Sequence, residues 1–370
     1  MKPDNRLTKL ARLIVQYSTE VQKNQQVKIS GSTASEPLVR ELYRAVLEAG
    51  AHPRVQMLLP DQQYIFYNTA QDFQLDYTDP QMLYEAEHVD RILQIFPDLN
   101  PHELTAIDPA KQQKAALANG PIMEAVMKRW GDGSLRWCGT ACPTPALAQE
   151  AHMSLEEYAE FVFDCMHLND EDPVAFWKEF SARQDKICQR LDNIREMRYV
   201  GEDTDLRFNV AGRKWINCDG RLNFPDGEVF TGPVEDSVEG TIRFTYPGVI
   251  QGKEIEDIFL RFEQGKVVEA SAAKGEELLQ NVLDTDDGSR FVGEVAIGTN
   301  DKITRFTKNM LFDEKMGGTV HVAIGRGLPE TGSNNVSTIH WDMLKDMKTG
   351  GEIYADGELI YQNGQFLSMD

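Results

Sequence analysis

Two histidines in the C-terminal half of this 370-residue chain have acidic neighbours at a spacing that suits metal ligands. His340 and Asp342 flank Trp341, so in an extended segment the imidazole and the carboxylate would project to the same face. His321 lies in the apolar run GGTVHVAIG, whose glycines let other groups approach. Divalent transition metals bind imidazole and carboxylate donors, which makes these three residues candidate ligands.

Three glutamates lie where a carboxylate would need a partner. Glu294 interrupts the apolar run FVGEVAIGTN, Glu228 follows a Pro-Asp-Gly turn, and Glu314 precedes His321 by seven residues. A buried carboxylate needs a cation beside it, either a divalent metal or a Lys or Arg side chain. Taken alone, each of these residues is more often a structural group with a satisfied partner, so spacing by itself leaves the assignment open.

Four carboxylates and two imidazoles would suit two adjacent divalent ions with one bridging carboxylate. Such a pair can bind and deprotonate water, polarise a carbonyl and anchor an amine. Oxygen and imidazole donors without thiolate fit Zn²⁺, Co²⁺ or Mn²⁺. These donors therefore predict hydrolytic chemistry.

Several segments resemble the motifs of the thermophilic M29 family of metallo-aminopeptidases. They are NFPDGEVFTGPVEDSVEG, VGEVAIGTN, LFDEKMGGTVHVAIG, PETGSNN and STIHWDM, with MSLEEYAEFVF before them. The resemblance implies an N-terminal α/β domain, a β-rich domain and a cytoplasmic, usually dimeric enzyme that removes N-terminal residues from peptides. It also implies a dinuclear centre with the ligands Glu228, Glu294, Glu314, His321, His340 and Asp342.

Within that set we expect Glu294 to be the catalytic residue, as a shared ligand or proton carrier. The chain departs from the family at Leu328, where the family commonly has a tyrosine thought to assist at the tetrahedral intermediate. Leucine cannot donate a hydrogen bond, so Tyr246 and Tyr354 are candidate replacements. We therefore expect metal binding to be kept and one transition-state donor to be missing.

Two other functions are compatible with the same residues. His321, His340 and Asp342 form a potential two-histidine, one-carboxylate set for non-haem Fe(II), and a related branch with this fold resembles ring-cleaving dioxygenases acting on dihydroxypyridines. The additional glutamates favour two metals over one. The third hypothesis is a metal-binding homologue with weak activity. The desolvation cost of burying ligands that serve no function argues against it.

The composition of the chain limits the classes of molecule that it could bind and the compartment in which it could work. The formal net charge of −21 disfavours nucleic acids and anionic membranes, and it would attract the free amino terminus of a peptide or simply keep the protein soluble. No apolar run approaches the roughly 20 residues of a membrane span, and no signal peptide is apparent. Five cysteines without a second close pair favour a reduced compartment such as the cytoplasm.

The order of elements predicts two domains. Residues 26–30, 36–49 and 52–59 read as strand, helix and strand, which indicates a parallel sheet. The segment SGSTAS between the first strand and the helix could bind an anion, but it lacks the known phosphate-binding patterns and is interpreted as a turn with an N-cap. Ser154 with Glu157 predicts a helix N-terminus. After about residue 200, short alternating runs separated by Asp-Gly and Asn-Gly turns predict antiparallel strands. We predict an α/β domain at 1–198 and an α+β, antiparallel-β-rich metal-binding domain at 199–370.

Overall fold

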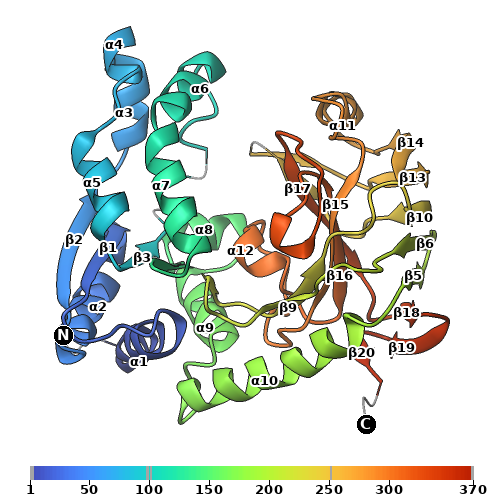
Figure 1. Cartoon of the computed structure of the whole chain (residues 1–370), viewed down its shortest axis with the longest axis horizontal. Helices are drawn as coiled ribbons and strands as arrows, with labels where there is room; N and C mark the ends of the chain where they lie inside the picture. Colours follow the sequence, from blue (N-terminus) through green and yellow to red (C-terminus); the bar gives the residue numbers. More distant parts are fainter. Residues whose placement is uncertain (1–3, 97–99, 101, 251, 368–370) are drawn as a thin grey trace. The chain divides into compact units, whose positions relative to one another are not determined.

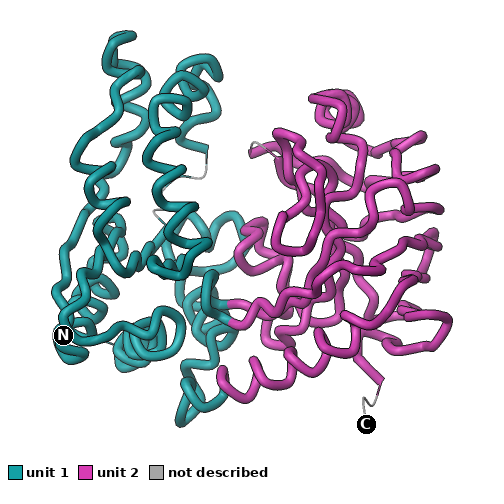
Figure 2. The backbone as a smooth tube through the Cα atoms, in the orientation of Figure 1, with its two compact units in different colours: residues 1–176, 220–225 teal, residues 177–219, 226–370 magenta. Residues whose placement is uncertain are grey.

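The computed structural model describes residues 4–96, 100, 102–250 and 252–367. The chain forms two compact units, which Figure 2 colours separately. Unit 1 comprises Met1–Phe176 and Gly220–Pro225, and unit 2 comprises Trp177–Asp219 and Asp226–Asp370. The domain boundary that the sequence predicts between residues 198 and 199 stays a prediction.

Unit 1 is built on a five-stranded sheet with the order β2-β1-β3-β4-β8, in which every pair is parallel. The predicted strand–helix–strand order is confirmed in β1, α2 and β2, with Ile29 of β1 opposite Val55 of β2. Helices accompany the sheet along the chain (Figure 1). The strands are β1 (Gln26–Ser32), β2 (His52–Leu58), β3 (Arg91–Ile95), β4 (Arg136–Thr140) and β8 (Asn223–Phe224).

Several helices of unit 1 begin at a side chain that accepts a hydrogen bond from the first turn. Ser154 Oγ accepts from the backbone N–H of Glu157 at 3.2 Å, as the sequence predicts for α9. Ser35 differs, because its hydroxyl donates to the Ser32 carbonyl and does not cap α2. The helices are α1 (Asn5–Leu13), η1 (Ile14–Ser18), η2 (Thr33–Ser35), α2 (Glu36–Glu48), α3 (Gln62–Thr69), α4 (Asp72–Leu75), α5 (Pro80–His88), α6 (Pro109–Ala118), α7 (Gly120–Gly131), α8 (Pro145–Glu150) and α9 (Leu155–Cys165).

Unit 2 holds the predicted antiparallel strands in two larger sheets and a two-stranded ribbon, β11-β12. One sheet has the order β14-β13-β10-β6-β5-β18-β19-β20 and the other β17-β16-β15-β9-β7. The strands are β5 (Glu196–Gly201), β6 (Thr204–Asn209), β7 (Ile216–Cys218), β9 (Glu228–Thr231), β10 (Glu239–Arg243), β11 (Gly248–Ile250), β12 (Lys253–Ile255), β13 (Phe259–Glu263), β14 (Lys266–Ser271), β15 (Val292–Gly298), β16 (Thr319–Gly325), β17 (His340–Asp346), β18 (Glu352–Ala355), β19 (Glu358–Gln362) and β20 (Gln365–Phe366).

One apolar core lies between the two larger sheets of unit 2. The eight-stranded sheet contributes Leu206 and Phe262, and the five-stranded sheet contributes Val295 and Val322 to the same cluster. The helices of unit 2 are α11 (Glu276–Leu283), α12 (Met310–Asp313) and η3 (Pro329–Thr331), and α10 (Pro173–Leu191) begins in unit 1 and continues into unit 2. Within the described residues, no helix combines the length and apolar character needed to cross a bilayer. The predicted fold class, a parallel α/β part followed by an antiparallel β-rich part, is confirmed.

Candidate metal centre

Most of the predicted ligands lie on one face of the five-stranded sheet of unit 2, β17-β16-β15-β9-β7. This is the face turned away from the apolar core. On β16, Val320 and Val322 belong to the core, so strand alternation turns His321 to the other face. The same rule turns His340 and Asp342 of β17 to that face, since the intervening tryptophan is a core residue. The antiparallel pairing of β16 with β17 brings these side chains together.

A bulge in β15 directs Glu294 to the same face. Val292 and Val295 both belong to the core, which simple alternation over three residues cannot achieve. The pairing of β15 with β16 shifts register between Val292 and Glu294, and this shift supplies the extra residue. Gly293 sits at the bulge, where a Cβ atom would lie only 2.2 Å from the Arg326 carbonyl oxygen. Glycine at this position therefore permits the backbone path that points Glu294 at the site.

His321 is the hub of one group of donors. Its Nε2 lies 3.2 Å from Glu294 Oε1 and 3.4 Å from Glu228 Oε2, the latter on β9. Asp342 Oδ1 is 3.8 Å from the same nitrogen. Donor atoms of Glu228, Glu294 and His321 all lie within 4.8 Å of one another, and all three residues are buried.

His340 belongs to a second group that shares Glu294 with the first. Its Nε2 lies 3.6 Å from Glu294 Oε2 and 3.5 Å from Asp342 Oδ1. Its Nδ1 donates to the Arg326 carbonyl at 2.7 Å, and because a carbonyl only accepts, this contact leaves Nε2 as the nitrogen that faces the carboxylates. The two oxygens of Glu294 thus face different histidines.

The donors fit divalent ions. Glu228 Oε2 and Asp342 Oδ1 are buried and receive no hydrogen bond from the described residues. A buried acceptor without a donor is unfavourable, and a coordinated cation would satisfy each of these two oxygens. The combination of carboxylate and imidazole donors is one that Zn²⁺, Co²⁺ and Mn²⁺ accept.

The histidines hold protons in the absence of ions. Burial acts to lower the pKa of His321, but the hydrogen bond to Glu294 and the charge of Glu228 outweigh it and raise the pKa to about 9. Burial also acts to lower the pKa of His340, but Asp342 and Glu294 raise it to about 10. Each histidine must lose its proton from Nε2 to become a ligand.

The carboxylates divide between two behaviours. Burial raises the pKa of Glu228 to about 8, against the opposing effect of a nearby ammonium, and burial likewise raises the pKa of Glu294. The pKa of Asp342 is instead lowered to about 2, because the charge of His340 outweighs the effect of burial. Asp342 is therefore the carboxylate that stays ionised most readily without a metal.

Within the part of the chain that the structure describes, Lys315 links the sixth predicted ligand, Glu314, to the other carboxylates. Glu314 caps the C-terminal end of α12, and its carboxylate contacts the ammonium of Lys315 directly. Lys315 Nζ also lies 3.7 Å from Glu228 Oε1 and 4.0 Å from Asp226 Oδ1. Although burial acts to lower the pKa of Lys315, the surrounding carboxylates, Glu314 first, raise it well above its ordinary value.

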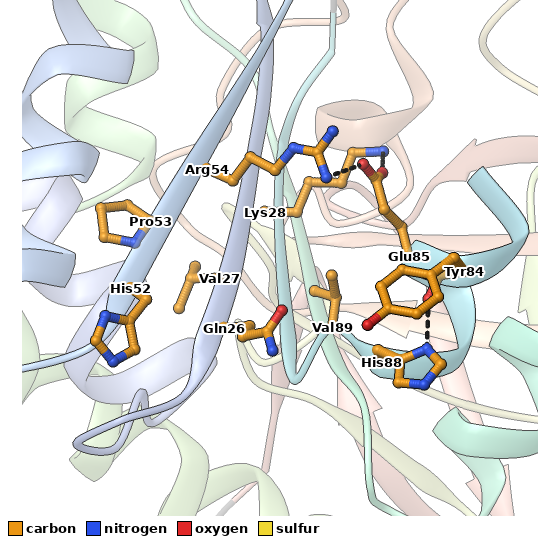
Figure 3. Close-up of a pocket in the computed structure, with 10 residues that line it drawn as sticks. All are labelled: Gln26, Val27, Lys28, His52, Pro53, Arg54, Tyr84, Glu85, His88 and Val89. Atoms are coloured by element: carbon orange, nitrogen blue, oxygen red, sulfur yellow. Dashed lines mark hydrogen bonds and ion pairs between the residues drawn. The ribbon is translucent and has the colours of Figure 1, made fainter. Parts of the chain in front are cut away.

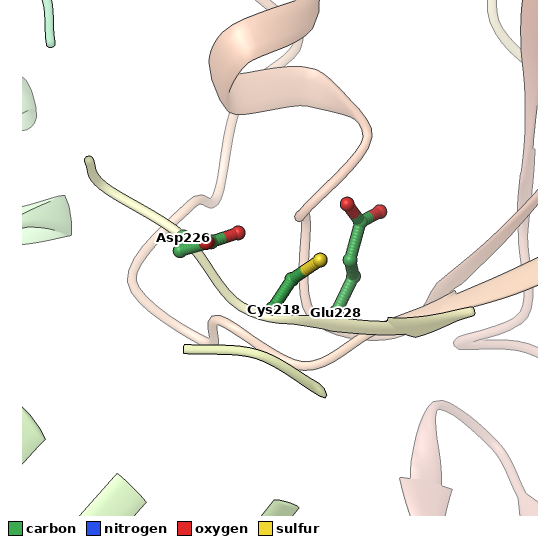
Figure 4. Close-up of side chains that lie close together, drawn as sticks. All are labelled: Cys218, Asp226 and Glu228. Carbon is green, nitrogen blue, oxygen red and sulfur yellow. The ribbon is translucent and has the colours of Figure 1, made fainter. Parts of the chain in front are cut away.

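A neighbouring acidic group contains a cysteine. Donor atoms of Cys218, Asp226 and Glu228 lie within 4.8 Å of one another, and Figure 4 shows these three side chains close together. Burial, with the acidic neighbours, raises the pKa of the Cys218 thiol well above its ordinary value. A protonated thiol is a poor metal ligand, so this group is less suited to an ion than the first.

Sequence reasoning missed Lys315, Asp226 and Cys218. The available signal was the lysine directly after Glu314 in FDEKMGG, since a buried carboxylate calls for a cation and Lys is one of the two choices. Cys218 and Asp226 gave no such signal, because β7 and β9 must pair before their side chains meet.

The two tyrosines proposed as replacements for the missing donor at Leu328 have other partners. Tyr246 Oη donates to Asp346 at 3.2 Å, and Tyr354 Oη donates to Glu352 at 2.7 Å. Within the described residues, neither hydroxyl bonds to a predicted ligand. Leu328 itself precedes η3 and is only partly buried.

A cavity in unit 1 is also lined by histidines and charged side chains, but its carboxylate is paired with cations. It has a volume of about 340 Å³ and lies beside β1, β2 and α5. Glu85 is paired at 2.8 Å with both Lys28 and Arg54, and His88 bonds to the Tyr84 carbonyl (Figure 3). The carboxylate there is already neutralised by two side-chain cations, so this cavity is less suited to a metal ion than the group around His321.

Known proteins resemble the chain along nearly its whole length. A sequence model of the family described as thermophilic metalloprotease (M29) matches residues 3–366. The chain is 29% identical over 364 residues to aminopeptidase 2 of Geobacillus stearothermophilus, covering 90% of this chain and 86% of that protein. It is 29% identical over 395 residues to aminopeptidase T of Thermus thermophilus, covering 95% of each.

Solved structures share the fold. Wild-type AmpT from Thermus thermophilus matches with a TM-score of 0.85 and 25% identity, covering 98% of this chain and 99% of that chain. The 2,5-dihydroxypyridine dioxygenase of Pseudomonas putida KT2440 matches with a TM-score of 0.59 and 15% identity, covering 98% and 97%. At that identity the second likeness concerns the fold alone.

Proposed function

The chain belongs to the M29 family of metallopeptidases and is therefore a metal-dependent hydrolase acting on peptides, and we propose that it removes N-terminal residues with two divalent ions that share Glu294. The observation that supports two ions is the split of Glu294, whose Oε1 faces His321 and whose Oε2 faces His340. Each half of the centre then has its own histidine and its own carboxylate.

In this proposal Glu228 Oε2, Glu294 Oε1 and His321 Nε2 would hold one ion. Glu294 Oε2, His340 Nε2 and Asp342 Oδ1 would hold the other. Donor atoms that share a tetrahedral ion at about 2.0–2.2 Å lie about 3.3–3.6 Å apart. The histidine-to-carboxylate separations within the two groups, 3.2–3.6 Å, agree with that requirement.

When bound, the ions supply the Lewis acidity that activates water and polarises the scissile carbonyl. The chain's own residues do the rest. The Arg326 carbonyl orients the ring of His340, and the carboxylates give the centre the negative charge that attracts a protonated α-amine. Glu294, buried between both histidines, is our candidate for the catalytic proton carrier.

The test is cleavage of matched peptides with and without an N-terminal acetyl group. Amino-acid p-nitroanilides and short free-amine peptides should be cleaved stepwise from the N-terminus. The acetylated peptides should not be cleaved, because acetylation removes the amine that the centre would bind. Efficient internal cleavage of the blocked peptides would instead make the protein an endopeptidase.

Ring-cleaving oxygenase chemistry is the second candidate, and one observation favours it. His321 and His340 both lie within 3.8 Å of Asp342, which gives a two-histidine, one-carboxylate set suited to non-haem iron. Elemental analysis separates the candidates, since one Fe per chain supports the oxygenase and Zn, Co or Mn supports the peptidase. Oxygen uptake with 2,5-dihydroxypyridine and Fe(II)-loaded protein provides the direct assay.

We further propose that the protein acts on peptides in the cytoplasm as a homodimer, without nucleic-acid or membrane partners. The net charge of −21 argues against nucleic acids and anionic membranes, and the odd number of cysteines argues for a reduced compartment. The homodimer is what the family resemblance implies. Light scattering behind a sizing column gives the mass in solution. A mass of one chain would contradict the dimer.

A further inference from the structure

The two faces of the parallel sheet in unit 1 are covered to different degrees. On one face, Ile29, Leu93 and Cys138 are buried. Strand alternation puts Lys28 of β1 and Trp137 of β4 on the opposite face, and both are only partly buried. Parallel sheets ordinarily have both faces covered, so the second face leaves room for another molecule.

A cavity of about 590 Å³ lies on this second face. The sheet contributes Lys28, Ile92, Gln94, Trp137 and Asn223 to its lining. Helices α5 and α7, which lie side by side (Figure 1), contribute most of the rest. All the lining residues belong to unit 1, and the volume falls within the range of small-molecule sites.

The apolar part of the lining is rich in sulfur and indole rings, which come from Met82, Met123, Met127, Trp130 and Trp137. Met123 and Met127 are 54% and 52% exposed, and exposed apolar side chains gathered in one place mark a binding surface. Methionine sulfur contacts ring edges favourably, and tryptophan stacks on ring faces. This lining therefore suits an aromatic ligand.

The charged part of the lining favours an anion. Glu85 lies between Lys28 and Arg54, at 2.8 Å from each, as Figure 3 shows. Two cations and one carboxylate leave this cluster a formal charge of +1, in a chain whose net charge is −21. Lys28 and Glu85 are the charged residues that line the cavity itself.

Hydrogen-bond donors of the sheet remain available in the cavity. Among the described residues, Glu85 is the only side chain paired with the Lys28 ammonium, which has three N–H groups. In the same part of the chain, the Asn223 side chain makes no hydrogen bond, and the Gln94 amide donates only to the Ile95 carbonyl at 3.2 Å. A carboxylate beside Lys28 would find these donors unoccupied.

We propose that this cavity binds a small aromatic carboxylate, with its ring among the methionines and tryptophans and its carboxylate at Lys28. None of the candidate metal ligands lines the cavity. Binding there needs neither a metal ion nor a cleavable peptide. The inference therefore stands or falls independently of the proposed aminopeptidase function.

The experiment is titration calorimetry of the full-length chain with 2-naphthoate, with and without EDTA. The chelator is included because a carboxylate also binds metal ions directly. We expect one site per chain with the same affinity in both conditions. Naphthalene-2-methanol has the same rings without the charge, and it should bind about tenfold more weakly or worse, since a charge-assisted hydrogen bond is lost.

Two variants test the placement of the ligand. Lys28→Met should weaken 2-naphthoate binding about tenfold, and it leaves Glu85 paired with Arg54, so that no carboxylate loses every partner. Met127→Asp places a negative charge at the cavity from an exposed position and should also weaken binding.

Matched control variants lie on α6, which contributes no lining residue among those described. Lys111 donates to the Tyr67 carbonyl at 2.7 Å, and Leu117 is 73% exposed. Lys111→Met and Leu117→Asp repeat the same changes of residue class away from the cavity. Both should bind 2-naphthoate as the wild-type chain does.

Three results would overturn the inference. The first is no binding of 2-naphthoate at concentrations up to about 1 mM. The second is binding that disappears with EDTA, which would place the probe at the metal centre. The third is equal binding of the acid and the alcohol, or wild-type affinity in Met127→Asp, which decides the question if Lys28→Met does not fold by circular dichroism.

Discussion

The two groups of candidate ligands share Glu294 but differ in what surrounds their other carboxylate. Around His340, Asp342 lies beside two imidazoles, and the charge of His340 lowers its pKa to about 2 in spite of burial, with a smaller contribution from Lys315. Around His321, Glu228 is turned partly toward a buried ammonium, and burial raises its pKa to about 8. Equal numbers of donors therefore do not give the two groups equal surroundings, because the fixed charges beside each carboxylate differ.

The largest effect should come from the candidate ligands on β17. Replacing His340 or Asp342 with Ala removes a candidate metal ligand, so metal content and peptidase activity should fall together. Outer-shell changes alone cost 10–100-fold in metal affinity, and loss of a direct ligand should exceed about 100-fold. Metal analysis with parallel rate measurements checks this, with Glu352→Ala on the other sheet as the carboxylate control. Full occupancy in both ligand variants would exclude the assignment.

A second effect concerns the chain beyond His321. Leu328 follows β16, where the family commonly has tyrosine, and a tyrosine hydroxyl aimed at the tetrahedral intermediate would stabilise it more than the substrate. Loss of one such donor typically costs about 10²–10³ in turnover, so Leu328→Tyr should raise kcat by up to about 10² with little change in KM. Steady-state kinetics on p-nitroanilides measures the split. An unchanged or lower kcat, with a brisk wild-type enzyme, would mean that the pocket is built around leucine.

Acid should weaken metal binding in both halves. In the metal-free chain the pKa values of Glu228, His321 and His340 are raised to about 8, 9 and 10, so these residues hold protons at neutral pH. An ion must displace those protons, and its affinity should therefore fall as pH drops, by about tenfold per pH unit for each proton released. Calorimetry in two buffers of different ionisation enthalpy counts the protons. Metal uptake without proton release would contradict these protonation states.

The smallest effect should come from a residue of unit 1, which contains none of the candidate ligands. Ser154 caps α9 through the Glu157 N–H, and Ser154→Ala should lower stability by about 1 kcal/mol. That change corresponds to a decrease in Tm of about 2–4 °C for a unit of this size. Thermal unfolding followed by circular dichroism measures it. Metal content should stay at the wild-type value, and a lost ion would show that the centre depends on α9.

Local patterns predict much of the fold and part of the site. The two-residue spacing of His340 and Asp342 was sufficient to place both side chains on one strand face, because β17 is regular. The strand–helix–strand order at the N-terminus was equally local. Glu294 was recognised as a carboxylate in an apolar run, but its direction depends on the bulge at Gly293, which no alternation rule reveals.

Long-range pairing set the limit of sequence reasoning. Residues 220–225 return to unit 1 and add β8 beside β4, where Thr140 pairs with Phe224, and nothing local in that segment predicts a parallel partner so distant in sequence. The contacts of Lys315 depend on the same kind of long-range pairing. Its neighbour Glu314 was visible as a candidate ligand, but only the folded chain brings Glu228 and Asp226 to the same ammonium.

The most direct test of the centre is an anomalous scattering map from crystals of the Co²⁺-loaded protein, collected on both sides of the cobalt edge. We predict one strong peak bounded by Glu294, His340 and Asp342. We predict a second peak bounded by Glu228, Glu294 and His321. A single peak, or no peak among these strands, would contradict the account.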